Sequence, residues 1–320
     1  MERQAIGKTP VKVTSIMFGT SALGNMPDTY GYGVDEDRAR ATLDAIFDGP
    51  MNCLDTSNNY GFGRSEARIG EAIRARGGLP AGFVISTKLD REMETGKFDA
   101  DQARRSIEQS LDRLGVDKVG LLHLHDPEHA ADLGEITCKG GALDELFKMK
   151  EEGIADAVGL AMGRVDMMFP ILKERPFDAL INHNRWTLLN RSADEMFDYA
   201  SHEGIAILNA APFAGGVLAK GADRMPKISY SPADKTALEP VRRVEDLATE
   251  HGIAPGAAAL QFSTRDPRIT STIVGVSRPE RVREMLEWND MSLPPKLLEA
   301  LASLPYSMED PEAHRDYRPG

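Results

Sequence analysis

Short apolar runs recur along the whole chain, and the segments between them carry apolar residues at helical spacing. Within each run the apolar residues are nearly continuous, as expected for parallel strands that are buried on both faces. Alternation of strand and helix, repeated about eight times, favours a (β/α)8 TIM barrel over an open doubly wound sheet. The candidate strands are residues 14–18, 52–55, 83–87, 119–123, 156–160, 178–182, 205–209 and 271–275.

The helical pattern is clearest over residues 100–114, where apolar side chains share one face. Asp99 followed by Gln102 predicts a capping box at the start of this helix. Ser192 and Glu195 have the same spacing and predict a second capping box before a later helix. These caps place helix starts where the apolar periodicity also begins.

The N-terminal segment and one long loop add two further elements to the predicted barrel. The segments on either side of Lys8-Thr9-Pro10 predict a hairpin that closes the bottom of the barrel. Residues 220–236 are too polar and too often interrupted by proline for a strand or helix, so they predict a long loop over the barrel rim. Because no Gly/Ser-rich or Pro-rich linker is present, we expect residues 1–320 to form a single domain.

The composition narrows the classes of partner. A net charge of −12 and a pI near 5.2 argue against nucleic acid or an anionic membrane as the main partner, although they allow a local basic pocket. The sequence has no signal-like apolar segment and no run of spanning length, so we expect a cytoplasmic protein with a small-molecule substrate. Cys53 and Cys138 suggest no disulfide framework, and no His/Asp cluster has the spacing of a metal site. Nothing in the sequence indicates an oligomeric state.

Residues suited to proton transfer stand at or just beyond the ends of three successive candidate strands. They are Asp55, Lys88 and His125, and Tyr60 lies in the glycine-rich loop that follows Asp55. A closed parallel barrel would bring all these strand ends to one rim. Each residue alone has an ordinary structural interpretation, such as a helix cap or a solvated strand end. Their occurrence together favours an enzyme active site.

The four residues have distinct expected roles. The unperturbed pKa of tyrosine is about 10, and a neighbouring ammonium group lowers it. Lys88 would therefore tune Tyr60 for proton exchange, while Asp55 orients Lys88. His125 would donate a hydrogen bond to the same substrate oxygen. His123 lies two residues before His125 and is expected deeper in the barrel as a core residue.

Several motifs resemble those of the aldo-keto reductase family over nearly the whole chain. They are MFGTSALGN, LDTSNNYGFGRSE, the lysine of ISTK, the HDP after the fourth strand, and RPERVRE. The pattern of Asp55, Tyr60, Lys88 and His125 corresponds to the catalytic tetrad of that family. The resemblance implies a nicotinamide cofactor bound across the barrel rim and direct hydride transfer at a carbonyl or carbinol carbon.

Three further segments, 183–200, 209–221 and 253–275, resemble a subgroup of sugar 1-dehydrogenases. That subgroup includes L-fucose and D-threo-aldose dehydrogenases, and some pyridoxal 4-dehydrogenases are similar. The implied reaction is oxidation of a cyclic hemiacetal, either an aldopyranose to its 1,5-lactone or pyridoxal to 4-pyridoxolactone. In that direction Tyr60 acts as the base.

The resemblance also implies where the cofactor binds. Family members usually offer a Ser-Asn pair to the nicotinamide carboxamide, but Ala161 and Met162 stand there, so Asn184 or Asn182 takes this task. Members that prefer NADP usually carry a lysine where this chain has Gly275, so NAD is favoured and NADP stays open. The expected cofactor contacts are Gly19, Thr20, Ser21, Asn184, Phe213, Ser277, Arg278 and Arg281.

Aromatic residues near the rim suit a polyhydroxylated or pyridine ring. Tyr30 in the first loop and Trp186 after the sixth strand are the expected substrate contacts. For Trp186, packing between the barrel and a helix is a nearly equal alternative. The rival function is a general NADPH-dependent reductase of aldehydes and ketones. A more distant rival is a nucleotide-sensing regulatory subunit.

Overall fold

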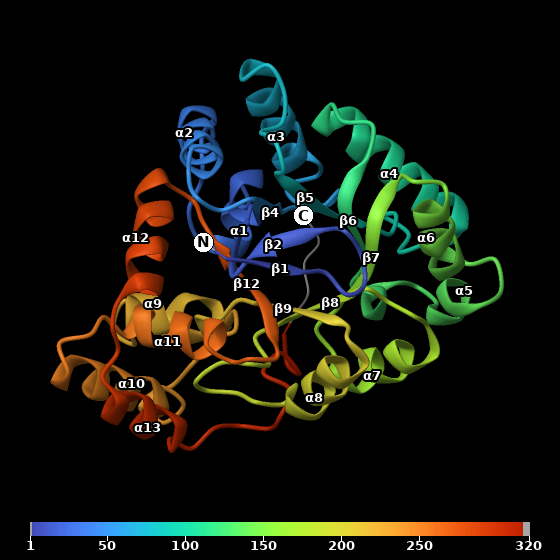
Figure 1. The fold of residues 1–320 in the computed structure, drawn as a ribbon. Coiled ribbons are helices and arrows are strands. Elements are labelled where there is room, and N and C mark those ends of the chain that lie inside the picture. The colour runs from blue at the N-terminus through green and yellow to red at the C-terminus, as the bar shows by residue number, and fades with distance from the viewer. Residues whose placement is uncertain (1, 316–320) are drawn as a thin grey trace.

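The structure is a computed structural model that describes residues 2–315, and its centre is a closed barrel of parallel strands (Figure 1). Neighbouring strands around the barrel follow the order β12-β3-β4-β5-β6-β7-β8-β9. The predicted strands match to within two residues at each end, and the (β/α)8 fold is confirmed. The barrel strands are β3 (Ile16–Gly19), β4 (Cys53–Asp55), β5 (Val84–Leu89), β6 (Val119–His125), β7 (Ala155–Ala161), β8 (Ala179–His183), β9 (Ala206–Ala210) and β12 (Ile269–Gly275).

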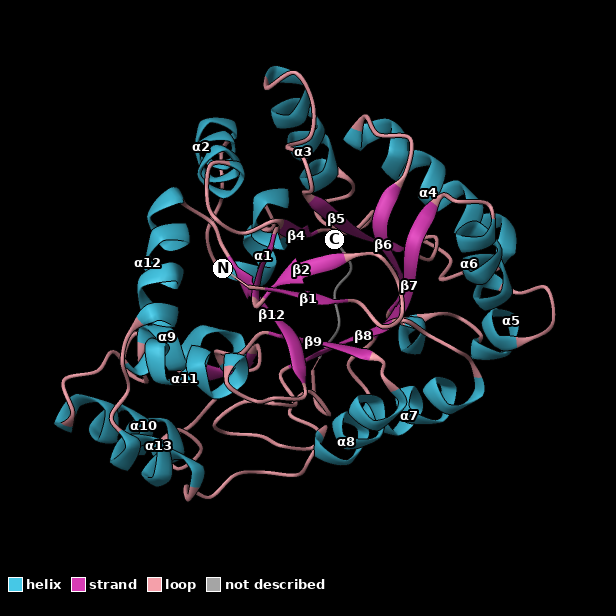
Figure 2. Ribbon diagram, in the orientation of Figure 1, coloured by secondary structure: helices cyan, strands magenta, loops and turns pink. Residues whose placement is uncertain are grey.

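Helices form a layer around the barrel (Figure 2). Their buried faces and the outward-facing side chains of the strands make one continuous apolar core. The longer helices are α2 (Glu36–Phe47), α3 (Arg64–Ala75), α4 (Ala100–Leu114), α6 (Ala142–Glu151), α7 (Val165–Glu174), α8 (Asp194–Glu203), α10 (Glu239–Glu250), α11 (Pro255–Thr264), α12 (Pro279–Asp290) and α13 (Pro295–Ala302). The shorter ones are α1 (Pro27–Tyr30), α5 (Leu133–Thr137) and α9 (Val217–Lys220), with 3₁₀ turns η1 (Ser21–Gly24), η2 (Pro127–His129) and η3 (Ala214–Gly216).

The two predicted caps have different outcomes. The Asp99 carboxylate accepts a hydrogen bond from the backbone N–H of Gln102 at 2.8 Å, so the N-cap half of the first capping box is confirmed. The other half is absent, because the Gln102 side chain donates to the backbone oxygen of Asp90 instead. The second prediction is wrong, because α8 begins only at Asp194 and its first turn has no side-chain cap. Ser192 instead donates its hydroxyl proton to Asn190 Oδ1 at 2.7 Å, which holds the chain in a turn before the helix starts.

The N-terminal hairpin is present and closes one end of the barrel, as predicted. Strand β1 (Arg3–Ala5) pairs with β2 (Lys12–Thr14) in antiparallel register, and the pair crosses the end of the barrel that faces the viewer in Figure 1. Ile6 and Val13 are fully buried in the apolar cluster inside the barrel. This end is filled with side chains, so the opposite end, where the strands have their carboxyl termini, is left for a binding site.

The predicted loop over residues 220–236 is confirmed except for its first residue, Lys220, which ends α9 (Val217–Lys220), and for a small hairpin within it. Strands β10 (Lys227–Ile228) and β11 (Ser231–Pro232) are joined by Ser229 and Tyr230, whose φ angles of 45° and 76° are left-handed. This turn brings Tyr230 to the rim. Within the described part of the chain, no helix has both the length and the apolar character needed to cross a membrane.

Candidate active site

A cavity of about 1020 Å³ opens at the carboxyl ends of the barrel strands, and every strand contributes to its lining. Asp55, Tyr60, Lys88 and His125 all line this cavity. The strand ends that the sequence placed on one rim therefore do meet there. We refer to these four residues as the proton-transfer cluster.

Asp55 and Lys88 form a buried ion pair at the floor of the cavity. Lys88 Nζ lies 2.7 Å from Asp55 Oδ2 and 2.5 Å from the backbone oxygen of Thr56. The Ser86 hydroxyl donates to the other carboxylate oxygen of Asp55 at 2.9 Å. The two charges are thus paired and hydrogen-bonded, which is the condition for keeping charged groups in a buried place.

Tyr60 is positioned by a close approach of two backbone segments. Gly61 has a φ of 61°, and a Cβ atom at this position would lie 2.0 Å from the backbone oxygen of Gly24. Only glycine fits so tight a contact in the left-handed region. The Tyr60 ring then lies with its centroid 4.8 Å from Lys88 Nζ and 5.9 Å, edge to face, from the His125 ring.

The proton affinity of Tyr60 differs from the expectation. Burial raises the pKa of Tyr60 well above its ordinary value, and the nearby Asp55 carboxylate raises it further. We expected Lys88 to lower this pKa. The reason for the difference is that the Lys88 ammonium is committed to Asp55 and to the Thr56 carbonyl. The protonated phenol is therefore the favoured form.

His125 is the last residue of β6 and is held between two carboxylates. Its Nδ1 lies 2.6 Å from Asp90 Oδ1, and its Nε2 lies 3.6 Å from Asp126 Oδ2. Burial lowers the pKa of His125, but Asp126 and Asp90 outweigh this effect, so the pKa is raised. His123 is fully buried deeper in the barrel, as expected, and burial lowers its pKa well below the usual value.

Most of the other residues expected at the site also line the cavity, namely Gly19, Ser21, Tyr30, Phe213, Ser277, Arg278 and Arg281. Thr20 does not, because its hydroxyl donates to the backbone oxygen of Asp55 at 2.9 Å and so ties β3 to β4. Trp186 also lies outside the cavity. Its ring stacks on Phe262 at 5.5 Å and carries the Arg268 guanidinium on one face at 4.5 Å. The structure thus places Trp186 between the barrel and the helices.

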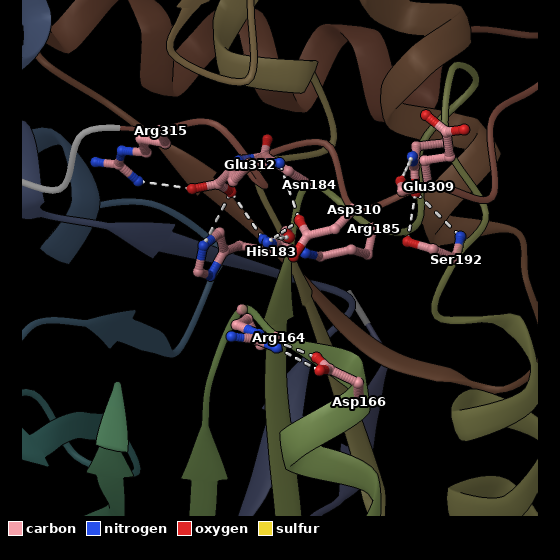
Figure 3. Close-up of polar contacts among 12 residues, drawn as sticks. Arg164, Asp166, His183, Asn184, Arg185, Ser192, Glu309, Asp310, Glu312 and Arg315 are labelled. Carbon is pink, nitrogen blue, oxygen red and sulfur yellow. Dashed lines mark hydrogen bonds and ion pairs between the residues drawn. The ribbon is translucent and has the colours of Figure 1, made fainter. Parts of the chain in front are cut away.

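Asn184 lies in a cluster of polar and charged side chains that joins the end of β8 to the C-terminal segment (Figure 3). Glu312 Oε1 accepts hydrogen bonds from Asn184 Nδ2 and Arg185 Nη1, both at 2.8 Å, and lies 3.1 Å from His183 Nε2. Its other oxygen accepts from Arg315 Nη1 at 2.7 Å. Asn184 Nδ2 is thereby engaged, and Asn182 donates its own amide protons to the backbone oxygens of Met162 and Gly163. The side-chain oxygens of both asparagines are buried and have no hydrogen-bond partner within residues 2–315.

We call this cluster the C-terminal clasp, and it forms one wall of the cavity. Its members are His183, Asn184, Arg185, Asp310, Glu312 and Arg315. Arg185 Nη2 lies 2.5 Å from Asp310 Oδ1, which anchors the segment a second time. These residues could not be predicted from the sequence, because no local pattern links the end of β8 with a segment more than 120 positions later.

The sequence analysis also missed a cationic group at the other end of the cavity. Lys220, at the end of α9, lines the cavity together with Arg278 and Arg281. Burial lowers the pKa of Lys220, and the charges of Arg281 and Arg278 lower it further, which shows that the three cations share one region. Within residues 2–315, neither Lys220 nor Arg278 has a carboxylate within ion-pair distance. The sequence did offer one signal for Lys220, because it is the first residue of the predicted rim loop, residues 220–236.

Comparison with known proteins agrees with this geometry. A profile of the aldo/keto reductase family matches residues 15–304. The chain is 27% identical to pyridoxal 4-dehydrogenase from Microbacterium luteolum, with 94% of this chain and 97% of that protein aligned. It is also 27% identical to D-threo-aldose 1-dehydrogenase from a Pseudomonas species, with 91% and 93% aligned. The holo form of aldo-keto reductase AKR11C1 from Bacillus halodurans shares the fold, with a TM-score of 0.78, 19% identity, and 99% and 100% coverage.

Because the family profile covers most of its length, the chain belongs to the aldo/keto reductase family. The protein is therefore an NAD(P)-dependent oxidoreductase. The resemblance to the sugar and pyridoxal dehydrogenases is confirmed at modest identity.

Proposed function

We propose that the enzyme oxidises a cyclic hemiacetal, either an aldopyranose at C1 to its 1,5-lactone or pyridoxal to 4-pyridoxolactone. The observation that carries this proposal is the convergence of Asp55, Tyr60, Lys88 and His125 in one cavity. The relatives named as pyridoxal 4-dehydrogenase and D-threo-aldose 1-dehydrogenase support the substrate class. Pyridoxal and an aldose each carry an aldehyde carbon and a hydroxyl group that can close on it to form a cyclic hemiacetal.

The chain supplies proton transfer and orientation, and a bound nicotinamide supplies the hydride acceptor. Tyr60 exchanges the proton of the substrate hydroxyl, and Lys88 with Asp55 keeps a positive charge beside its ring. His125 hydrogen-bonds the same substrate oxygen and fixes the reacting carbon. Tyr30 lines the cavity above the cluster and contacts the ring of the substrate.

The cavity fits a dinucleotide together with a substrate. Its volume of about 1020 Å³ lies at the upper end of the roughly 300–1,000 Å³ usual for a single small ligand. Lys220 and Arg278 present charges that phosphate groups would neutralise, at the end of the cavity near α12. Gly19, Ser21, Phe213, Ser277 and Arg281 also line the cavity and are the remaining proposed cofactor contacts.

NAD is the proposed cofactor. Gly275 provides no side chain for a 2′-phosphate, and a Cβ atom at this position would meet nothing within 4 Å. The cations at Lys220 and Arg278 then serve the pyrophosphate that NAD and NADP share. Lys220→Ala should accordingly weaken the binding of NAD and of NADP by similar factors. A loss confined to NADP would instead indicate a 2′-phosphate contact.

The test of function is cofactor reduction by the purified protein with NAD⁺ and, separately, NADP⁺. The substrates are L-fucose, L-galactose, D-arabinose and pyridoxal, and a sugar methylated at its anomeric oxygen is the matched control. Rapid NADH formation with one ring, and none with its blocked glycoside, is the expected result. No cofactor reduction with any of the four rings would overturn the proposal.

A general NADPH-dependent carbonyl reductase is the second candidate, and one observation favours it. The raised pKa of Tyr60 favours the protonated phenol, which is the form that donates a proton to a carbonyl oxygen. This candidate predicts consumption of NADPH with varied aldehydes and ketones. The same purified protein can be assayed in both directions, so the two functions are separated by one set of measurements.

A further inference from the structure

Asp90 is a buried carboxylate in direct contact with His125, and the roles proposed above do not use it. It follows β5 by one residue and is 1% exposed. Asp90 Oδ1 lies 2.6 Å from His125 Nδ1. Its other oxygen accepts hydrogen bonds from the Ser57 hydroxyl at 2.5 Å and from the backbone N–H of Asn59 at 3.0 Å.

These contacts determine which nitrogen of His125 carries a proton towards the carboxylate. An ionised carboxylate can only accept hydrogen bonds, and Ser57 and Asn59 already donate to Oδ2. The contact at Oδ1 is therefore made by an Nδ1–H group of His125. Nε2, the other ring nitrogen, lies 3.6 Å from Asp126 Oδ2, and both His125 and Asp126 line the cavity.

We propose that Asp90 is a positioning residue for the reaction, because it fixes the tautomer and orientation of His125 so that Nε2 faces the reacting substrate oxygen. This inference rests on the proposed function, since it concerns the same oxygen. Asp90 itself does not line the cavity. It acts through the imidazole in the way that a buried carboxylate orients a catalytic histidine in other enzymes.

The fixed tautomer has a consequence for each direction of the reaction. When the ring is neutral, Nδ1 holds the only proton, so Nε2 accepts a hydrogen bond from the hydroxyl of an alcohol or hemiacetal. When the ring is protonated, Nε2–H donates to a carbonyl oxygen. Oxidation is then favoured on the alkaline side of the His125 titration, and reduction on the acid side.

Other charged groups around His125 act on the same titration. Asp126 and Asp90 raise the pKa of His125, while burial and the Lys88 ammonium lower it. Tyr60 and His123 also face the ring, from the loop after β4 and from β6 itself. Among these groups, Asp90 is the one that hydrogen-bonds Nδ1 with its carboxylate. Removing the charge of Asp90 should therefore lower the pKa of His125 and allow either ring nitrogen to carry the proton of the neutral ring.

The experiment is a pH titration of the histidine ring nitrogens by ¹⁵N NMR in the wild-type protein and in Asp90→Asn. His125→Asn identifies the signal of His125 among the seven histidines of the chain. In the wild type, Nδ1 should stay protonated at every pH while Nε2 titrates. In Asp90→Asn the pKa of His125 should fall by about 1–3 units. The acid limb of kcat/KM for hemiacetal oxidation should move in the same direction, and the KM for NAD should stay nearly constant.

Two further variants separate positioning from a loss of structure. Ser57→Ala removes a hydroxyl that donates to Asp90 Oδ2 and also lies 3.2 Å from His125 Nδ1, but it keeps the contact between Asp90 and His125. If Asp90 sets the titration, the raised pKa of His125 should persist in this variant. Asp156→Asn removes a carboxylate that pairs with Lys118 on the outside of the barrel, and it should leave the titration unchanged. An unchanged His125 titration in Asp90→Asn would overturn the proposal, as would a wild-type ring that carries its proton on Nε2 alone.

The wild-type spectrum needs no variant to fold and no substrate to be known. If the NMR result agrees but no hemiacetal is oxidised, the proposed function fails while the Asp90–His125 pair stands. If oxidation is observed but the pKa of His125 is the same in Asp90→Asn as in the wild type, the role proposed for Asp90 fails while the proposed function stands.

Discussion

The proton-transfer cluster and the C-terminal clasp line one cavity, but they are built differently. The cluster stands on β4, β5 and β6 and on the loop after β4, and its partners are close in the sheet: Lys88 meets Asp55 from a neighbouring strand. The clasp joins the end of β8 to Glu312, which lies 128 residues beyond Asn184 (Figure 3). Strand register determines the geometry of the cluster. Contacts between the end of β8 and residues 310–315 determine the geometry of the clasp.

The difference indicates a division of tasks between the two regions. Side chains on barrel strands are held by the hydrogen bonds of the sheet, so they suit chemistry that depends on accurate placement. Residues 310–315 contain no helix or strand, and side-chain contacts hold them to the end of β8. Such contacts suit recognition of the substrate, because a change in the clasp alters the shape of the cavity without moving the Asp55–Lys88 pair at its floor. We expect variants of the cluster to act on kcat and variants of the clasp to act on KM.

The largest effect should come from Tyr60→Phe. This change removes the hydroxyl group and keeps the ring that packs beside Lys88 and His125. We expect kcat to fall by about 10²–10⁴-fold, the usual contribution of a proton-transfer group. The affinity for NAD should stay close to that of the wild type, measured by fluorescence titration of NADH.

The matched control for that change is Tyr199→Phe. Tyr199 lies on α8 with its ring against Phe169, away from the cavity. It should retain wild-type kcat. Substantial turnover by the Tyr60 variant would contradict the assignment of this residue and remove the main contrast between the two regions.

A smaller effect, of a different kind, should come from Glu312→Gln. The substitution takes a negative charge away from Arg185, His183 and Arg315. Hydrogen bonds to charged groups contribute about 1.5–3 kcal/mol, so we expect a lower free energy of unfolding and a raised KM for substrate. The kcat should change little. Steady-state kinetics and chemical denaturation measure these outcomes.

The same carboxylate gives the clasp a dependence on pH. Burial raises the pKa of Glu312, but His183 and Arg185 outweigh this, so its pKa in the folded state is depressed. Its contribution to stability is therefore present above the unfolded pKa of about 4.3 and is lost as pH falls towards the folded value. Glu312→Gln should flatten this acid-side loss, whereas Glu309→Gln, at an exposed position in the same segment, should not. A variant with an altered kcat and an unaltered KM would contradict the proposed division.

The sequence predicted the cluster because both of its determinants are local. Apolar runs mark the strands, and closure of a parallel barrel places the strand ends of Asp55, Lys88 and His125 together. Asp90 was accessible to the same reasoning. It lies two residues after Lys88, so the alternation of side chains along β5 directs it to the same side, towards His125.

The clasp and Trp186 could not be predicted in this way. No periodicity links Glu312 to β8, because the contact depends on how residues after α13 return to the rim. Trp186 follows the sixth strand in the sequence, and a strand end alone does not determine whether the side chain turns into the cavity or out to the helices. Contact with Phe262 and Arg268 turns it outwards. Tertiary packing decides such positions.

The smallest effect on catalysis should come from Glu128, which lines the cavity close to Asp126. Its Oε1 accepts hydrogen bonds from the backbone N–H groups of Gly163 at 2.7 Å and Arg164 at 3.3 Å, and its Oε2 is buried. Burial, and then the charge of Asp126, raises the pKa of Glu128 to about 7. A folded-state pKa above the unfolded value means that the stabilising contribution is complete below about pH 4.3 and is lost as pH rises through the folded pKa.

Glu128→Gln keeps the side chain neutral at every pH and should remove this loss. The margin by which the variant exceeds the wild type in free energy of unfolding should grow by up to about 2–3 kcal/mol between pH 5 and pH 8. Denaturation at the two pH values measures the difference, with Glu174→Gln as a control at an exposed position. Equal stability of variant and wild type at both values would mean that Glu128 is ionised throughout. Asp126 and Glu128 would then place two neighbouring negative charges on the wall of the cavity at neutral pH.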